Sequence, residues 1–255
     1  MSTLSVLVIT LNEEKNIREC LQSVSWADEI VLVDAQSQDR TVEIAGEFTD
    51  RVFVRPWAGF AATRQYALSQ CRQEWVLWLD ADERATPELA REIREVIRDT
   101  AHAGFEIPRL AWFLGRWIRH GGWYPGYVLR LFRRQGAEFT DRMVHEGVVV
   151  KGSTGKLKNH LLHYTDPNIE HYFQKFNLYT GLAARELHEK GVPFRLRDLI
   201  FRPLFMFIKM YLLRRGFLDG LQGFLLACFS SAYVFAKYAK LWELTYGEMH
   251  HSKPI

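Results

Sequence analysis

Cysteines are few in this sequence, and long hydrophobic runs are missing. The three cysteines, Cys20, Cys71 and Cys228, lie far apart and no C-x-x-C pair occurs, which argues against a disulfide framework and against a cysteine-ligated metal site. Such sparse cysteine usage favours a reducing, cytoplasmic location. The first residues include no basic segment and no cleavage-like site, so no signal peptide is predicted. Because no run of 18 uncharged apolar residues occurs, no membrane span is predicted either.

An excess of charge of one sign is also missing. Lys and Arg number 33 against 30 Asp and Glu, for a net charge of +3, and this mildly basic balance does not by itself indicate a nucleic-acid-binding protein. With 255 residues, 48% of them hydrophobic, the chain is long enough for one large domain, or one domain with an appendage, and a substantial core. Neither internal repeats nor low-complexity segments occur.

The first hundred residues alternate between strand-like and helix-like patterns. Short, β-branched, apolar runs predict buried strands, and apolar residues at helical spacing predict helices. A β-α-β series of this kind predicts an α/β fold, in which helices cover both faces of a mostly parallel sheet. The predicted strands are 4–10, 29–34, 51–54 and 74–79, and the predicted helices are 14–24, 41–48, 59–70 and one that Thr86 caps and Pro87 opens.

Polar side chains follow several of these strands, at the edge where ligands bind in parallel sheets. Asp80 and Asp82 come directly after a buried strand, and two carboxylates at i and i+2 can hold a hard divalent cation that grips phosphate oxygens. The alternative is a solvated turn with a helix cap. Asp34 ends another strand and could accept hydrogen bonds from a base or ribose, whereas Asp39 could equally be a plain cap for the helix that begins near Thr41.

The pattern changes after residue 103. An irregular, β-rich segment is predicted for 104–164, with short strands near 127–132, 147–150 and 156–163, followed by helices over 167–190, 196–213 and 217–244. We therefore divide the chain into residues 1–165, which hold the α/β pattern, and a C-terminal helical region of residues 166–255.

Arginines and aromatic residues alternate between Arg109 and Arg134. Arginine binds phosphate through bidentate hydrogen bonds, and aromatic faces stack on sugar rings, so this segment suits an anionic glycolipid acceptor. A solvated basic face over a small aromatic core is the plain alternative. Nucleic acid would fit the segment too, but the acids at several strand ends would repel its phosphates. The candidate acceptor-binding residues are Arg116, Trp123, Tyr124 and Arg130.

The predicted helix over 196–213 combines Phe and Leu with basic residues. That composition is typical of a helix that lies in a membrane interface, with its basic side chains toward lipid phosphates, although simple packing against the rest of the protein is the alternative. The expected location is cytoplasmic, peripheral on the inner face of the cytoplasmic membrane.

A set of short segments lies along the chain at the predicted strand ends and beyond them. They are Val8-Ile9-Thr10-Leu11-Asn12-Glu13-Glu14, Val33-Asp34, Ser37, Asp39-Arg40-Thr41, Arg64, Leu79-Asp80-Ala81-Asp82-Glu83, Val144-His145-Glu146-Gly147 and Leu161-Leu162-His163-Tyr164. In order and spacing, these segments resemble the family 2 inverting glycosyltransferases of the GT-A fold. The resemblance continues to the C-terminal helices and is closest to the bacterial lipopolysaccharide core β-1,4-glucosyltransferase group. One departure is that Ala35 and Gln36 stand where many members have small polar or glycine residues.

The resemblance implies a role for each matching residue. Thr10, Leu11 and Glu13 would line a nucleoside pocket, Asp34 would contact the base or ribose, and Arg64 would reach the nucleotide or diphosphate. Asp80 would lie near the ribose or metal, and Asp82 would be the main ligand of a divalent metal, Mg or Mn. His163 would complete the metal or diphosphate site, unless it is a structural histidine.

An inverting transfer also needs a base on the acceptor side. Glu146 is the first candidate and Asp141 the second, and a surface position is the plain alternative for Glu146. The expected reaction is transfer of a hexose, glucose from UDP-glucose, to a lipopolysaccharide-core or related membrane glycolipid. The alternatives are the same fold acting on a polyprenyl-phosphate or capsule intermediate, and a non-catalytic module that binds nucleotide sugars or nucleic acid.

Overall fold

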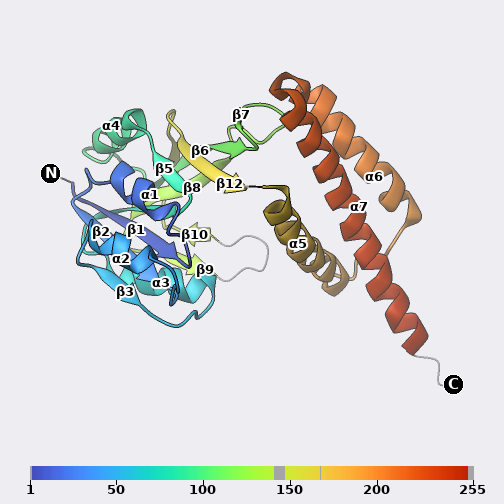
Figure 1. The fold of residues 1–255 in the computed structure, drawn as a ribbon, viewed down its shortest axis with the longest axis horizontal. Coiled ribbons are helices and arrows are strands. Elements are labelled where there is room, and N and C mark those ends of the chain that lie inside the picture. The colour runs from blue at the N-terminus through green and yellow to red at the C-terminus, as the bar shows by residue number, and fades with distance from the viewer. Residues whose placement is uncertain (1, 141–146, 167, 252–255) are drawn as a thin grey trace. The chain divides into compact units, whose positions relative to one another are not determined.

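The computed structural model describes residues 2–140, 147–166 and 168–251, and Figure 1 shows the order of the elements. The chain forms two compact units. Unit 1 comprises Met1–Leu110 and Pro125–Tyr164, and unit 2 comprises Ala111–Tyr124 and Thr165–Ile255.

A mixed sheet forms the centre of unit 1. Its first four strands are mutually parallel, β8 is antiparallel to β4, and β6 is antiparallel to β8. The predicted α/β fold with a mostly parallel sheet is confirmed. In sheet order the strands are β3 (Val52–Val54), β2 (Glu29–Asp34), β1 (Leu4–Thr10), β4 (Trp75–Asp80), β8 (Tyr127–Arg133), β6 (Gly104–Phe113), β12 (Leu161–Asp166) and β5 (Glu83–Ala85), with β11 (Thr154–Lys156) beside β6. A separate pair joins β9 (Glu138–Thr140) to β10 (Gly147–Val149).

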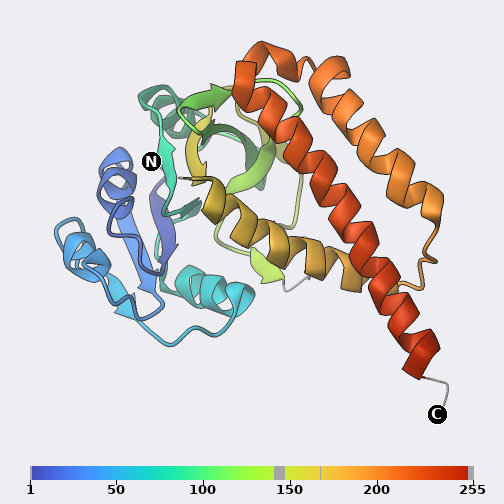
Figure 2. The same cartoon turned by 45° about the vertical axis from the view of Figure 1, so that its right-hand side comes forward.

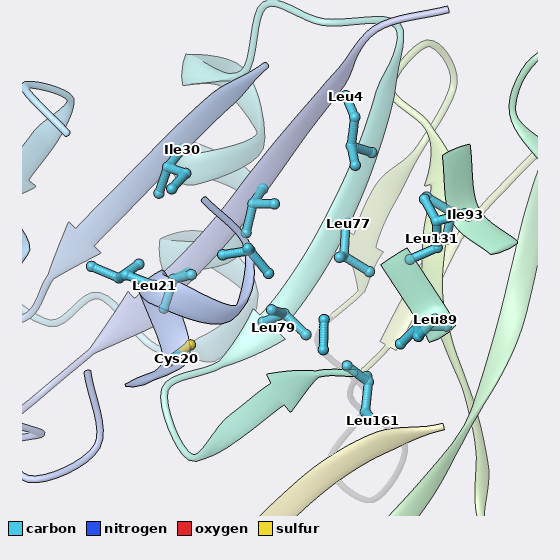
Figure 3. Close-up of a cluster of buried hydrophobic side chains, with 14 of the residues drawn as sticks. Leu4, Cys20, Leu21, Ile30, Leu77, Leu79, Leu89, Ile93, Leu131 and Leu161 are labelled. Atoms are coloured by element: carbon cyan, nitrogen blue, oxygen red, sulfur yellow. The ribbon is translucent and has the colours of Figure 1, made fainter. Parts of the chain in front are cut away.

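Helices cover both faces of this sheet, so its central strands are buried on both sides. One face of β4 presents Leu77 and Leu79 to side chains from α1 and α4, as Figure 3 shows. The other face presents Val76 and Trp78 to residues of α3. The helices are α1 (Ile17–Ser23), α2 (Thr41–Gly46), α3 (Phe60–Gln70) and α4 (Pro87–Val96).

The predicted start of α4 is confirmed. The Thr86 hydroxyl accepts a hydrogen bond from the Leu89 amide at 3.2 Å, and Pro87 occupies the first turn, where a missing amide hydrogen costs nothing.

The long strand β6 was not predicted. Its partly exposed positions, Glu106, Arg109 and Trp112, recur every third residue along Gly104–Phe113, and the other positions are buried. Neither the strand nor the helix periodicity therefore stands out in the sequence. The strand crosses from unit 1 into unit 2 after Leu110.

Unit 2 contains a hairpin and three long helices. The end of β6 pairs with β7 (Arg116–Ile118) around a turn at Leu114 and Gly115, both in the left-handed region. Helices α6 and α7 pack along each other and α5 packs on α7, an arrangement that Figure 2 shows clearly. The elements are α5 (Ile169–Glu189), α6 (Leu196–Ile208), a π-helical turn η1 (Lys209–Leu213), a 3₁₀ turn η2 (Gly216–Asp219) and α7 (Gly220–His251).

No membrane span was predicted, but one helix is long and apolar enough to cross a membrane by length and composition. The segment is Gly216–Gly247, and 28% of its apolar window is buried. The sequence patterns predicted too short a helix here, because α7 continues without a break past Lys237 to His251. The core helices of soluble proteins can be equally long and apolar, so this statement concerns the length and composition of the helix alone.

All three cysteines are free. Cys20 and Cys71 are buried in unit 1, and burial raises the pKa of both thiols, that of Cys71 to about 12. Cys228, on α7, is only partly buried, and desolvation raises the pKa of its thiol as well.

Candidate active site

The register of the sheet brings the predicted polar residues of three strands to one edge. Thr10 lies opposite Asp34 across the β1–β2 pair, and Ile9 lies opposite Asp80 across the β1–β4 pair. The carboxyl ends of β1, β2 and β4 therefore meet at one place, as expected for a ligand-binding edge.

Asp34 is fully buried and its carboxylate is already hydrogen-bonded. It accepts from the Thr10 hydroxyl at 3.0 Å, from the Ser37 amide at 2.8 Å and from the Ser37 hydroxyl at 2.5 Å. These bonds make Asp34 the organiser of the loop after β2. Gln36, in that loop, has φ +65°, so a side chain stands where the backbone conformation favours glycine.

The loops after β1 and β2 are also joined to each other. The Asn12 amide donates to the Ser37 hydroxyl at 2.7 Å, and the Asn12 side-chain oxygen accepts from the Gln38 amide at 2.8 Å. Leu11 remains 49% exposed at this edge. The two loops therefore form one cross-linked rim with an apolar side chain open to solvent.

Asp39 has a clear structural contact. Its carboxylate accepts from the Thr41 amide at 3.0 Å and from the Thr41 hydroxyl at 2.5 Å, and it also accepts from the Glu14 amide at 3.1 Å. Slight burial opposes ionisation, but these hydrogen bonds outweigh it and lower the pKa of Asp39. The N-cap position of α2 is Arg40, which has no side-chain cap hydrogen bond, so Asp39 stabilises the turn that precedes the helix rather than occupying the cap position.

Asp80 is held by a buried arginine. Arg130, only 3% exposed, forms ion pairs with Asp80 and, at 2.9 Å, with the fully buried Glu83. Glu83 also accepts the Asp80 amide at 3.0 Å and lies 3.4 Å from Arg109. Burial alone would raise the pKa of Asp80, but Arg130, with help from Arg64 and Arg109, lowers it, so the carboxylate is charged at neutral pH.

A second arginine lies on the same aromatic ring. The guanidinium carbon of Arg130 is 4.0 Å from the Trp78 ring centre, and that of Arg64 is 4.4 Å from it. Arg64 also lies over Phe60 at 4.9 Å and is buried. Two arginines are thus stacked on one ring beside Asp80 and help to balance the charge of the acids at this strand end.

Asp82 and His163 lie side by side. The Asp82 Oδ2 and His163 Nε2 atoms are 3.4 Å apart, and both side chains are about one-fifth exposed. Strand β12 brings them together, since His163 pairs with Glu83 and the Tyr164 amide donates to the Asp82 carbonyl at 2.9 Å.

The Asp82–His163 pair could bind a divalent ion that also has other ligands. Two ligands about 2.1 Å from an octahedral ion are roughly 3.0 Å apart at right angles, so a separation of 3.4 Å needs only a small adjustment. Within the described residues, no group of three His, Cys, Asp or Glu side chains could hold a metal. Among the described residues, Asp82 and His163 could supply two ligands, which would leave positions for phosphate oxygens and water, the usual ligands of Mg²⁺.

The profile of glycosyl transferase family 2 matches residues 5–157, which contain this arrangement apart from His163 and Tyr164 on β12. The chain belongs to this family. The lipopolysaccharide core biosynthesis glycosyltransferase LpsC of Rhizobium meliloti (strain 1021) is 34% identical over 254 residues, covering 94% of this chain and 92% of LpsC. An uncharacterized glycosyltransferase of Rickettsia typhi (strain ATCC VR-144 / Wilmington), RT0209, is 30% identical and covers 96% of this chain and 88% of its own length.

Solved structures share the fold of this family 2 glycosyltransferase. The mannosyltransferase PcManGT from Pyrobaculum calidifontis, in complex with GDP-Man and Mn²⁺, has a TM-score of 0.57 at 14% identity and covers 94% of this chain and 87% of its own. S. aureus TarS 1–349 in complex with UDP-GlcNAc has a TM-score of 0.51 at 16% identity, with 96% and 92% covered. At such identities the likeness concerns the fold alone.

The other predicted site residues of this transferase are distributed differently. Glu146 and Asp141, the candidate bases, lie outside the described residues. Arg116, Trp123 and Tyr124 belong to unit 2, whereas Arg130 belongs to unit 1.

Arg130 does not have the exposure that an acceptor-binding residue needs. It is buried against Trp78, and its guanidinium is committed to Asp80 and Glu83. Sequence reasoning missed Glu83 and Trp78 as members of the site. A usable signal was present, because Glu83 directly follows the paired acids and an acid so close to a buried strand needs a cationic partner.

Proposed function

We propose that this family 2 enzyme is a metal-dependent, inverting glucosyltransferase. It would move glucose from UDP-glucose to a lipopolysaccharide-core or related anionic membrane glycolipid. The observation that carries the proposal is the pairing of Asp82 with His163 beside the arginine-held Asp80, at the shared edge of β1, β2 and β4. The name of LpsC supports the choice of acceptor class.

The donor would bind at the ends of these strands. Thr10 and the Asp34 loop would face the nucleoside with Leu11 and Glu13, and Arg64 would meet the diphosphate. Asp80, ionised because its pKa is lowered, would accept a hydrogen bond from the ribose. Arg130 would hold Asp80 in position, and we propose this role for it in place of acceptor binding.

Asp82 and His163 would hold Mg²⁺ or Mn²⁺, which, when bound, neutralises charge on the departing diphosphate. The acceptor hydroxyl oxygen forms the new bond to the anomeric carbon while the bond to the diphosphate breaks. Glu146 would take the hydroxyl proton, and Asp141 is the second candidate for this task. A single displacement of this kind inverts the configuration at the anomeric carbon.

Unit 2 would bring the enzyme to the membrane surface. Its surface exposes many large apolar side chains together with basic ones, and this combination suits the anionic inner leaflet of the cytoplasmic membrane. Apolar side chains would enter the interface, and the long basic side chains would extend to the headgroups. The most exposed apolar residues of α6, η1 and the start of α7 are Leu196, Ile200, Phe201, Leu204, Phe205, Leu212, Leu213 and Leu221.

The donor site is tested with Asp82→Asn and, as a matched control, Asp99→Asn, which changes an exposed acid outside the strand ends. UDP-glucose should raise the Tm of the wild type and of Asp99→Asn only when Mn²⁺ is present, because binding to the folded state stabilises it. Asp82→Asn should lose this metal-dependent rise and its turnover. Near-normal turnover by Asp82→Asn would contradict the metal site.

Membrane association is tested separately by co-sedimentation with anionic and neutral vesicles. Changing the exposed Arg195, Arg197 and Arg215 to Glu should weaken binding to anionic vesicles, and high salt should weaken it further. Absence of binding to every lipid composition, together with full activity on a soluble acceptor, would contradict the membrane role.

A further inference from the structure

Unit 2 contains a pocket of its own, with a volume of about 430 Å³. Its wall is formed by the loop at residues 121–123, by α5, by the end of α6 with η1, and by α7, all of which belong to unit 2. The volume suits a small ligand of the size of a sugar phosphate or a lipid headgroup. Nothing in the glycosyl-transfer reaction proposed above uses this pocket.

The charged side chains that line the pocket are all basic. Lys209, Arg214 and Lys237 line it, and no Asp or Glu does. None of the three forms a salt bridge with another residue that the structure describes. Lys237 is half-buried, and desolvation, followed by the nearby charge of Arg202, lowers its pKa.

Other cations of unit 2 do have partners. Arg202 pairs with Asp198 at 2.8 Å, Lys190 pairs with Glu186, and Lys240 donates to Asn177. These three cations thus have acceptors, whereas no acid lines the pocket beside Lys209, Arg214 and Lys237, and Glu186 acts on Lys237 only through its longer-range charge. Such a place favours an anion.

The wall beside Arg214 is fixed by close backbone packing. The Gly121 amide donates to the Arg214 carbonyl at 2.9 Å. A Cβ on Gly122 would lie 2.2 Å from Nη1 of Arg214, and Gly122 has φ +89°. Only glycine lets the Arg214 side chain lie across this loop.

The buried carboxylate of Asp219 fixes the residues that precede this loop. Asp219, 3% exposed, accepts the amides of Arg119 at 3.1 Å and His120 at 2.7 Å, and it pairs with Nδ1 of His120 at 2.9 Å. The π-helical turn η1 forms another part of the wall, since it includes Lys209 and Met210. Turns of this kind are frequent at functional sites.

Aromatic and apolar groups complete the pocket. Trp123, Tyr172 and Tyr233 line it and offer faces to a sugar or glycerol group. Leu212 and Leu213 on η1 are more than half exposed. A phosphate-bearing lipid has a phosphate, a glycerol or sugar group and acyl chains. The cations of the pocket, its aromatic faces and the exposed leucines of η1 match these three parts.

We propose that this pocket binds the phosphate monoester headgroup of an anionic lipid. Lys209, Arg214 and Lys237 would bind the phosphate, and the leucines of η1 would contact the acyl chains. A headgroup held in a cavity is a saturable, selective site, unlike the general attraction of basic residues to a charged surface. The pocket would bind such a lipid whether or not the chain transfers a sugar, so the test below measures binding alone.

The test uses the full chain and phosphatidylcholine vesicles that contain phosphatidic acid or phosphatidylserine, adjusted to equal surface charge. The wild type should prefer phosphatidic acid. The double change Lys209→Gln/Lys237→Gln should reduce that preference by about tenfold or more, because two hydrogen bonds to a charged group are lost. Lys209→Arg/Lys237→Arg, which keeps both charges, should retain the preference, and this result would show that the two positive charges are what the preference requires.

The matched control is Arg195→Gln/Arg197→Gln, which removes the same charge from the exposed surface of unit 2. It should weaken binding to both vesicles equally and leave the preference intact. Equal binding of the wild type to both vesicle types would overturn the proposal. Glycerol 3-phosphate and inorganic phosphate are added as soluble competitors. If these soluble phosphates bind at the pocket but the protein shows no preference between the two vesicle types, the ligand of the pocket is a free phosphate compound and the lipid assignment is wrong.

Discussion

Arg130→Met removes the positive charge that Asp80 and Glu83 share. Methionine keeps an apolar stem against Trp78 but leaves Glu83, which is fully buried, with only Arg109 at 3.4 Å. Removing one partner of a buried ion pair costs about 3–5 kcal/mol. Because the Asp80 carboxylate is one-third exposed and can regain water, we expect a loss near the lower end, about 3 kcal/mol. That is a large fraction of the stability of an ordinary domain.

The assay is urea-induced unfolding followed by circular dichroism, with hydrogen exchange of peptides that cover β4 and β8 as a local measure. Arg133→Met is the matched control. Arg133 lies on the same strand, but its ion pair with Glu74 is well exposed, so its loss should cost at most about 1 kcal/mol. If Arg130→Met lost no more stability than Arg133→Met, the cluster would not hold the strand end as we describe.

The pH dependence provides an independent check. The pKa of Asp80 is lowered in the folded wild type, so its contribution to stability is complete above the unfolded pKa of about 3.9 and is lost as the pH falls. Without Arg130, the largest cause of this lowering is lost, so the contribution of Asp80 to stability becomes smaller. The stability difference between wild type and variant should therefore stay constant from pH 7 to about 4 and narrow as the pH falls below about 4. A difference that also stays constant below about pH 4 would refute this reasoning.

Three further predictions concern catalysis, capping and packing. Glu146→Gln should slow transfer by roughly 10²–10⁴-fold with donor binding unchanged in calorimetry; an unchanged rate, with Asp141→Asn inactive, would assign the base to Asp141. Thr86→Ala should lower the urea-unfolding free energy by about 1 kcal/mol because it removes the cap of α4, and an unchanged midpoint would contradict that role. Gly223→Ala should lower the Tm, since its Cβ would lie 1.9 Å from a backbone oxygen of η2, whereas Gly247→Ala, with open space around it, should leave the Tm unchanged or raise it.

The parallel half of the sheet could be predicted because its strands are buried on both faces. Such strands appear as unbroken apolar runs, and the polar residues after Thr10, Asp34 and Asp80 then share one edge by topology alone. Strand β6 could not be predicted, since its partly exposed positions recur every third residue. The grouping of residues 111–124 with the C-terminal helices also has no signature in the local sequence.

The paired acids of the candidate site were predictable, but the partners that hold them were not. Arg130 lies 47 positions from Glu83 in the sequence and 50 from Asp80, and local patterns carry no information on contacts at that range. Its neighbours in the sequence are arginines and aromatic residues, and so it was assigned to the acceptor with them. Only the antiparallel pairing of β8 with β4 places its side chain beneath Asp80.

The unequal burial of the three cysteines has a practical use. Cys20 and Cys71 lie inside unit 1, and their raised pKa values leave almost no thiolate at neutral pH. Cys228 is the one that solvent reaches in part. A maleimide dye should therefore attach to α7 in the unmodified chain, and unfolding in urea should release two further reactive thiols. The native sequence thus provides a single attachment point for a fluorescent probe on the helix that lines the phosphate pocket.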